Sequence, residues 1–161
     1  MPQKNDSSPP SQPSDPAIDS LDASQGRVLI GFDPGRDKCG LAVMGLDQTL
    51  HFHDVIASDQ AIATLMRLQN QFQVEQLVLG DQTTSKSWKA RIEQELPTHA
   101  PIQLIDERYT TLEARDRYWA MFPPTLLARL LPQGLRPLPR PIDDIVAILL
   151  IERYLAAKRF S

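Results

Sequence analysis

Acidic side chains stand next to the apolar runs of this sequence at four places along the chain. They are Asp33, Asp81, Asp106, Glu107, Asp143 and Asp144. Three of the four places directly follow a short apolar run, and sites form where the carboxyl ends of parallel strands meet. Carboxylates gathered there repel one another unless cations lie between them. Oxygen-only ligands suit Mg²⁺ or Mn²⁺, and two such ions can activate a water and stabilise the leaving oxygen of a phosphodiester.

Each acid also has a purely structural interpretation. Asp33 begins an Asp-Pro-Gly sequence, which is common in turns. Asp143 or Asp144 is suited to cap a helix, and Glu107 could pair with Arg108 on the surface. The catalytic interpretation therefore depends on all of the acids lying at the same edge of one sheet.

Hydrophobic periodicity predicts the elements that position these acids. A short apolar run predicts a strand at 28–33, a second strand follows at 39–45, and alternating residues predict a third at 49–57. The three are close enough in sequence to form an antiparallel meander. The later elements are predicted as helix 61–72 capped by Ser58 or Asp59, strand 75–80, a helix carrying Trp88, Ile92 and Leu96, strand 101–106, a helix beginning at the capping box Thr110–Glu113, and helix 143–157. This order predicts an α/β fold, with a mixed five-stranded sheet of three antiparallel strands and then parallel strands, and helices on both faces.

Composition limits the class of protein. A length of 161 residues favours one domain. The first 25 residues are rich in Pro, Ser and Asp, and their four aspartates against one lysine account for the net charge of −3. We expect a disordered tail at 1–25 and a single domain at 26–161. The single cysteine, Cys39, the missing signal peptide and the absence of an 18-residue apolar run predict a cytoplasmic protein without a membrane span.

Basic side chains near the acids are candidates for holding a nucleic acid. Residues 115–141 carry five arginines against one aspartate, and six prolines stiffen the segment around a short predicted helix at 125–131. The arginines are Arg115, Arg117, Arg129, Arg136 and Arg140. Arginine forks suit phosphate oxygens, so this segment could track a nucleic-acid backbone. Arg36, Lys38 and Arg108 lie beside the acids and could do the same. The alternative for all of these side chains is ordinary solvated surface charge.

Two histidines and three aromatic residues have competing interpretations. His51 and His53 stand two apart on a predicted strand and are expected on one face. No third metal ligand is near them in sequence, which favours surface or core positions over a metal site. Trp88, Tyr118 and Trp119 could stack on bases, but their helical spacing favours the core.

Three motifs give a resemblance to a known family. The sequence GFDPGRDKCGLAV at 31–43 resembles the opening hairpin of the YqgF/RuvX family. DERYTTLEAR at 106–115 resembles its most recognisable internal motif, and IDDIVAILL at 142–150 is similar to its last motif. The similarity spans about residues 27–155, and the three motifs in this order are specific to the family.

The resemblance implies an RNase H-like fold and a nuclease related to Holliday-junction resolvases, with Mg²⁺ or Mn²⁺ as its cofactor. Bacterial members of the family are implicated in maturing the 5′ end of the precursor of the small-subunit ribosomal RNA. By position, the acidic trio of the family falls on Asp33, Glu107 and Asp143, with Asp144 as the alternative to Asp143. The family often has Gly-Leu-Pro after its fourth strand; here the chain has Gly-Asp-Gln, which adds Asp81 as a candidate ligand.

Other functions stay open on the sequence alone. The protein could be a Holliday-junction resolvase acting on branched DNA, or a catalytically weak RNA-binding module that assists ribosome assembly. A nucleotide-binding protein of the actin and sugar-kinase type also has Gly-x-Asp-x-Gly before a strand, but it needs two such lobes and 161 residues supply one.

Overall fold

The computed structural model describes residues 18, 26–96, 98–108 and 110–160. Five strands form one sheet in the order β3-β2-β1-β4-β5. The strands are β1 (Arg27–Asp33), β2 (Lys38–Gly45), β3 (Leu50–Ala57), β4 (Gln73–Gly80) and β5 (Ile102–Ile105). Strand β2 is antiparallel to β1 and β3, whereas β4 is parallel to β1 and β5. The predicted mixed sheet, a meander followed by parallel strands, is confirmed.

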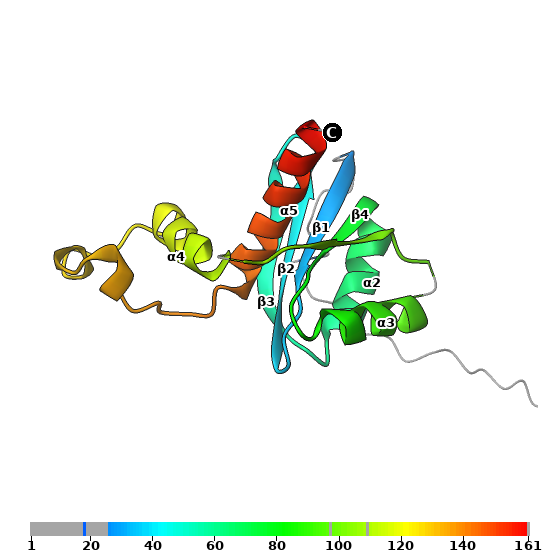
Figure 1. The fold of residues 1–161 in the computed structure, drawn as a ribbon, viewed down its shortest axis with the longest axis horizontal. Coiled ribbons are helices and arrows are strands. Elements are labelled where there is room, and N and C mark those ends of the chain that lie inside the picture. The colour runs from blue at the N-terminus through cyan, green and yellow to red at the C-terminus, as the bar shows by residue number, and fades with distance from the viewer. Residues whose placement is uncertain (1–17, 19–25, 97, 109, 161) are drawn as a thin grey trace, which may run out of the picture.

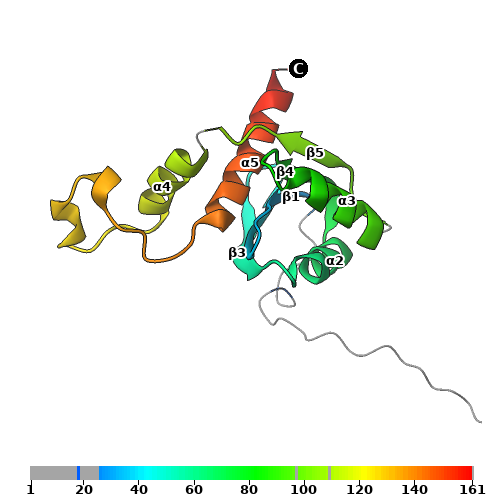
Figure 2. The ribbon, with the colours of Figure 1, turned by 60° about the horizontal axis from the view of Figure 1, so that its bottom comes forward.

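Helices cover both faces of this sheet, as the order of elements predicted. The helices are α2 (Ala61–Gln71), α3 (Ser85–Glu95), α4 (Thr110–Met121) and α5 (Asp143–Arg159). Helices α2 and α3 lie on one face and α5 lies across the other, with α4 packed against α5 (Figures 1 and 2). Over the described residues, none of these helices combines the length and the apolar character that a membrane crossing requires.

The central strand β1 is buried on both of its faces. Ile30 and Phe32 point into the core beneath α2 and α3, whereas Leu29 points into the core beneath α5. All three side chains are fully buried. A short strand that is apolar at successive positions is the pattern expected between two helical layers.

Helix α5 is buried over most of its circumference. Ile148 and Ile151 pack on the sheet, while Ile145 and Leu149 pack against Tyr118 of α4. The sequence predicted this burial because the helix is apolar nearly all round. The helix runs two residues beyond its predicted end.

One residue of the predicted tail belongs to the core. The side chain of Ile18 is 1% exposed and packs in the cluster beneath α2 and α3. The other residues of 1–25 lie outside the described part of the chain, so disorder of that segment stays a prediction.

The predicted cap of α2 is wrong. The residue at its N-cap is Gln60, which makes no side-chain capping hydrogen bond. Ser58 is turned elsewhere, because its hydroxyl donates a hydrogen bond of 3.2 Å to the carbonyl of Gly35 in the turn after β1. The Ser58 hydroxyl therefore binds a residue that is distant in sequence and does not cap the helix.

The predicted capping box at the start of α4 is also wrong. Thr110 is already part of the helix, and both its amide and its hydroxyl donate to the carbonyl of Glu107. The carboxylate of Glu113 instead accepts hydrogen bonds from Arg153 of α5. The helix therefore begins as predicted, but a neighbouring helix supplies the partner of Glu113.

Residues 122–141 form an arm that projects from the sheet on the side of α4 (Figures 1 and 2). In place of a helix at 125–131, the arm contains two 3₁₀ turns at Ala128–Leu130 and Gln133–Leu135. Five of its six leucines are exposed, namely Leu126, Leu127, Leu130, Leu131 and Leu135, whereas Leu138 packs against the cluster between α4 and α5.

Candidate active site

Three predicted carboxylates come from three different elements and meet at one end of the sheet. Asp33 is the last residue of β1, Glu107 follows β5 by two residues, and Asp143 begins α5. Burial, together with the negative charges of Glu107 and Asp143, raises the pKa of Asp33 to about 8. Such an effect requires the three groups to lie near one another.

Asp33 and Asp143 line one pocket of about 260 Å³. Gln82, from the loop after β4, and Thr111, from the first turn of α4, also line this pocket. The pocket therefore gathers side chains from the ends of two parallel strands and the starts of two helices, which is where ligands bind in such sheets.

The side chain of Glu107 lies beside this pocket and packs over Gly80. A Cβ added at Gly80 would come within 1.0 Å of its Oε1 atom, so only glycine leaves room for this carboxylate. Glu107 is 5% exposed, and neither of its carboxylate oxygens has a hydrogen-bond partner among the described residues. Burial, together with the charge of Asp81, raises the pKa of Glu107 to about 7, against smaller lowering effects of the nearby Gln82 side chain and of Arg153.

Asp81 fixes the backbone that carries Glu107. Its Oδ1 accepts a hydrogen bond of 3.1 Å from the amide of Glu107, and its own amide donates to the carbonyl of Ile105. The predicted surface pair between Glu107 and Arg108 is wrong, because Arg108 binds Asp106 instead.

The donor chemistry of the site fits a divalent cation. Within the described ranges, no three His, Cys, Asp or Glu side chains are arranged as a metal cage. The unpaired oxygens of Glu107 and the raised pKa of Asp33 nevertheless mark carboxylates that a cation would stabilise. Asp33 and Asp143 already face one pocket.

Asp144, the alternative to Asp143, is held away from the pocket. It is 1% exposed, and its Oδ2 lies 2.6 Å from Nδ1 of His53. Arg140 donates to both carboxylate oxygens at 3.0 and 3.1 Å. Burial alone would raise the pKa of Asp144, but the hydrogen bonds from His53 and Arg140 outweigh burial and lower it. Of the two neighbouring acids, Asp143 is therefore the one that lines the pocket.

Replacement of Asp144 by Asn is expected to destabilise the protein by about 1–3 kcal/mol at pH 7, because buried hydrogen bonds to a charged group are lost. Because the pKa of Asp144 is lowered in the folded protein, its charge stabilises the fold at pH values above the ordinary pKa of 3.8. This stabilisation is lost as the pH falls through the pKa that Asp144 has in the folded protein. Urea unfolding at pH 7 and pH 3 measures the difference. The exposed variant Glu93→Gln is the control, and an Asp144→Asn effect of equal size at both pH values would contradict this account.

The two histidines lie on opposite faces of the sheet, contrary to prediction. The pairing of β2 with β3 shifts by one residue at His51, which forms a bulge. The ring of His51 therefore lies against Phe72 on the α2 side, whereas His53 reaches Asp144 on the α5 side. One extra residue in a strand reverses the side to which the following side chains point.

Three predicted nucleic-acid contacts also hold the arm together. Arg115 donates to the carbonyl of Arg136 at 2.9 Å, and Nε of Arg136 donates to the carbonyls of Ala128 and Leu131. Arg140 pairs with Asp144, as described above. Contact of these residues with a nucleic acid stays a prediction.

Arg153 is a positioning residue that the sequence did not reveal. From α5 it donates to the carbonyls of Asp106 and Arg108 at 2.6 and 2.9 Å, and to the carboxylate of Glu113. It thereby ties the loop that carries Glu107 to the last helix. The available signal was the adjacent pair Glu152 and Arg153 within a largely apolar helical stretch, and such a pair does not identify the partner of the arginine.

Gly40 allows Asp143 to approach Asp33. It pairs with Asp33 across the β1–β2 ladder. A Cβ at Gly40 would lie 1.9 Å from the carbonyl oxygen of Asp143. The start of α5 therefore rests directly on the backbone of β2, next to the end of β1.

No family model matches the chain. A curated protein of Psychrobacter sp. (strain PRwf-1), named "Putative pre-16S rRNA nuclease", is 30% identical, and the alignment covers 89% of this chain and 85% of that protein. Among solved structures, T. thermophilus RuvC in complex with a Holliday junction substrate matches with a TM-score of 0.51 at 16% identity, over 83% of this chain and 96% of that chain. The structural likeness shows an RNase H-like fold. On the strength of the sequence relative, the chain belongs to the YqgF/RuvX family of RNase H-like nucleases.

Proposed function

We propose that this nuclease is a divalent-metal-dependent endonuclease that cuts structured RNA, with the 5′ end of pre-16S rRNA as its substrate. The observation that carries the proposal is the meeting of Asp33 and Asp143 in one pocket, with Glu107 close enough to raise the pKa of Asp33. The substrate follows from the name of the relative that is 30% identical. A cytoplasmic location, predicted from the sequence, belongs to the same proposal.

Asp33, Glu107 and Asp143 would hold Mg²⁺ or Mn²⁺, with Asp81 as a further candidate ligand. A bound cation would supply an activated water and stabilise the leaving oxygen. Asp33, whose pKa is about 8, has to lose its proton before it can act as a ligand. Asp81 and Arg153 keep the backbone around Glu107 in place from two sides.

The test of this function compares two substrates side by side. A pre-16S rRNA fragment carrying its 5′ leader and a four-way DNA junction are incubated with the protein in Mg²⁺, in Mn²⁺ and in EDTA. We expect cleavage of the RNA in the presence of either metal ion and none in EDTA. Cleavage of the junction alone would move the substrate to branched DNA. Tight RNA binding without cleavage in either metal would instead identify an RNA-binding module.

A further inference from the structure

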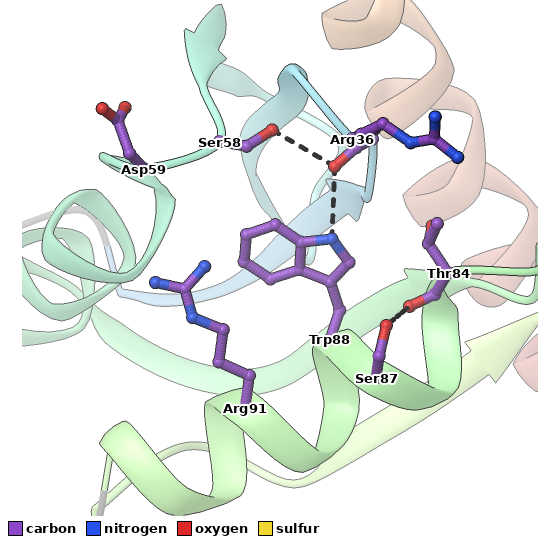
Figure 3. Close-up of a pocket in the computed structure, with 8 residues that line it drawn as sticks. Arg36, Ser58, Asp59, Thr84, Ser87, Trp88 and Arg91 are labelled. Atoms are coloured by element: carbon purple, nitrogen blue, oxygen red, sulfur yellow. Dashed lines mark hydrogen bonds between the residues drawn. The ribbon is translucent and has the colours of Figure 1, made fainter.

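A second pocket, of about 510 Å³, is shown in Figure 3. It lies next to the carboxylate pocket. It is formed by the β1–β2 turn, the end of β3 and the start of α3. Gly35 lines both pockets, so they share one wall. We propose that this second pocket binds a backbone phosphate of the nucleic-acid strand that is cut, an inference that rests on the proposed function.

The wall of the pocket is fixed by hydrogen bonds to the turn that follows Asp33. Ser58 and the indole of Trp88 both donate to the carbonyl of Gly35, at 3.2 and 3.3 Å. Thr84 donates to the carbonyl of Pro34 at 3.1 Å. These donors are therefore committed to the protein, and recognition of an anion falls on the arginines that line the pocket.

Two arginines stand on either side of Trp88 in this pocket (Figure 3). Arg36 is exposed and has no ion-pair partner among the described residues. Arg91 lies over the Trp88 ring at 5.0 Å from its centroid, and its Nε donates to Glu95 at 2.7 Å. These contacts orient the guanidinium of Arg91, and oriented arginine forks suit phosphate oxygens.

The chemistry of the pocket favours a phosphate over a base. The ring of Trp88 is 7% exposed and Arg91 covers it, so little aromatic surface is offered for stacking. The charged lining residues are two arginines and one acid, Asp59, and Glu95 pairs with Arg91 from outside the lining. Among the described residues, Arg36 is therefore the unpaired positive charge of the pocket. In a nuclease, the phosphates nearest to the cleaved bond are those of the same nucleic-acid strand. Sequence reasoning had already placed Arg36 near the site; the fold adds Arg91.

The test measures the binding of a fluorescein-labelled RNA stem-loop by anisotropy, in EDTA so that no cleavage occurs, at a series of salt concentrations. We expect Arg36→Gln and Arg91→Gln each to weaken binding by about fivefold to tenfold and to lower the slope of log affinity against log salt by about one unit. Arg159→Gln, an equal charge change at the exposed end of α5, is the matched control and is expected to behave as wild type.

Two more variants separate a phosphate contact from a loss of structure. Asp59→Asn removes the acid of the pocket and is expected to tighten binding about twofold to fivefold, which a damaged fold would not do. Arg91→Lys keeps the charge and is expected to retain the salt slope. If Arg36→Gln and Arg91→Gln bind as Arg159→Gln does, the phosphate site is refuted, although cleavage by wild type would still support the nuclease. Absence of cleavage in wild type would refute the nuclease, whatever the salt slopes are.

Discussion

Replacement of Asp33 by Asn is expected to reduce metal-dependent cleavage by about a thousandfold, while the protein remains folded. The carboxylate lies at the end of the central strand, between the charges of Glu107 and Asp143. An amide has nearly the same shape but carries no charge to hold a cation. Each loss of about 1.4 kcal/mol of charge stabilisation in the transition state lowers the rate tenfold. A thousandfold lower rate therefore corresponds to a loss of several kcal/mol.

The same substitution is expected to make the metal-free protein more stable at pH 8. The folded protein keeps a proton on Asp33 up to about pH 8, whereas the unfolded chain releases it near the ordinary value of 3.8. A raised folded pKa gives stability that is fully present below the unfolded value and is lost as the pH rises through the folded value. The variant has no such titration, so its advantage in free energy of unfolding grows between pH 4 and pH 8.

Two measurements check these expectations. Single-turnover cleavage in Mn²⁺ compares Asp33→Asn with wild type, and urea unfolding in EDTA at pH 5 and pH 8 compares their stabilities. If the variant cleaves at the wild-type rate, Asp33 is not part of the site. If the stability difference between the variant and wild type shrinks as the pH rises, Asp33 is not a buried carboxyl with a raised pKa.

Replacement of Gly40 by Ala is expected to destabilise the protein by about 3 kcal/mol and to abolish cleavage. The added Cβ would meet three backbone atoms of Asp143 and Asp144, at 1.9, 2.1 and 2.6 Å. Backbone at the start of a buried helix cannot move aside as a flexible side chain can. The start of α5 must shift, and Asp143 shifts with it.

Gly134 supplies a matched control for this substitution. A Cβ there would have no atom within 4 Å, so Gly134→Ala is expected to change the stability by less than about 0.5 kcal/mol. Urea unfolding of both variants and of wild type, together with cleavage assays, measures the difference. Equal unfolding midpoints for Gly40→Ala and Gly134→Ala would show that α5 does not rest on β2 as described.

The sequence was informative wherever the signal was local. The apolar run before Asp33 and the apolar helix after Asp143 predicted both the elements and the acids at their ends, and the structure contains β1 and α5 in those places. A strand or helix that is buried between two layers of the fold is apolar along its length. The pattern therefore predicts the element even when the residues that pack against it are unknown. The mixed sheet was predictable for the same reason, from the order of short strands and helices.

The contacts around the site were not predictable because their partners are distant in sequence. His53 and Asp144 are 91 residues apart, and Arg153 is 47 residues from Asp106. Local rules assigned Ser58 and Glu113 to helix caps, whereas the fold gives them Gly35 and Arg153 as partners. The bulge at His51 was not predictable either, because no glycine or proline lies beside His51 in the sequence.

The positions of Asp33 and Asp143 along the chain affect when activity can arise. Strands β1, β2 and β3 pair with near neighbours in sequence, whereas Asp33 meets Asp143 only after a loop of more than a hundred residues has closed. Asp143 is the first residue of α5, so the carboxylate pocket forms only when the start of this helix has packed on β2. Assembly of the pocket therefore depends on one contact of long sequence separation, however early the strands β1, β2 and β3 pair.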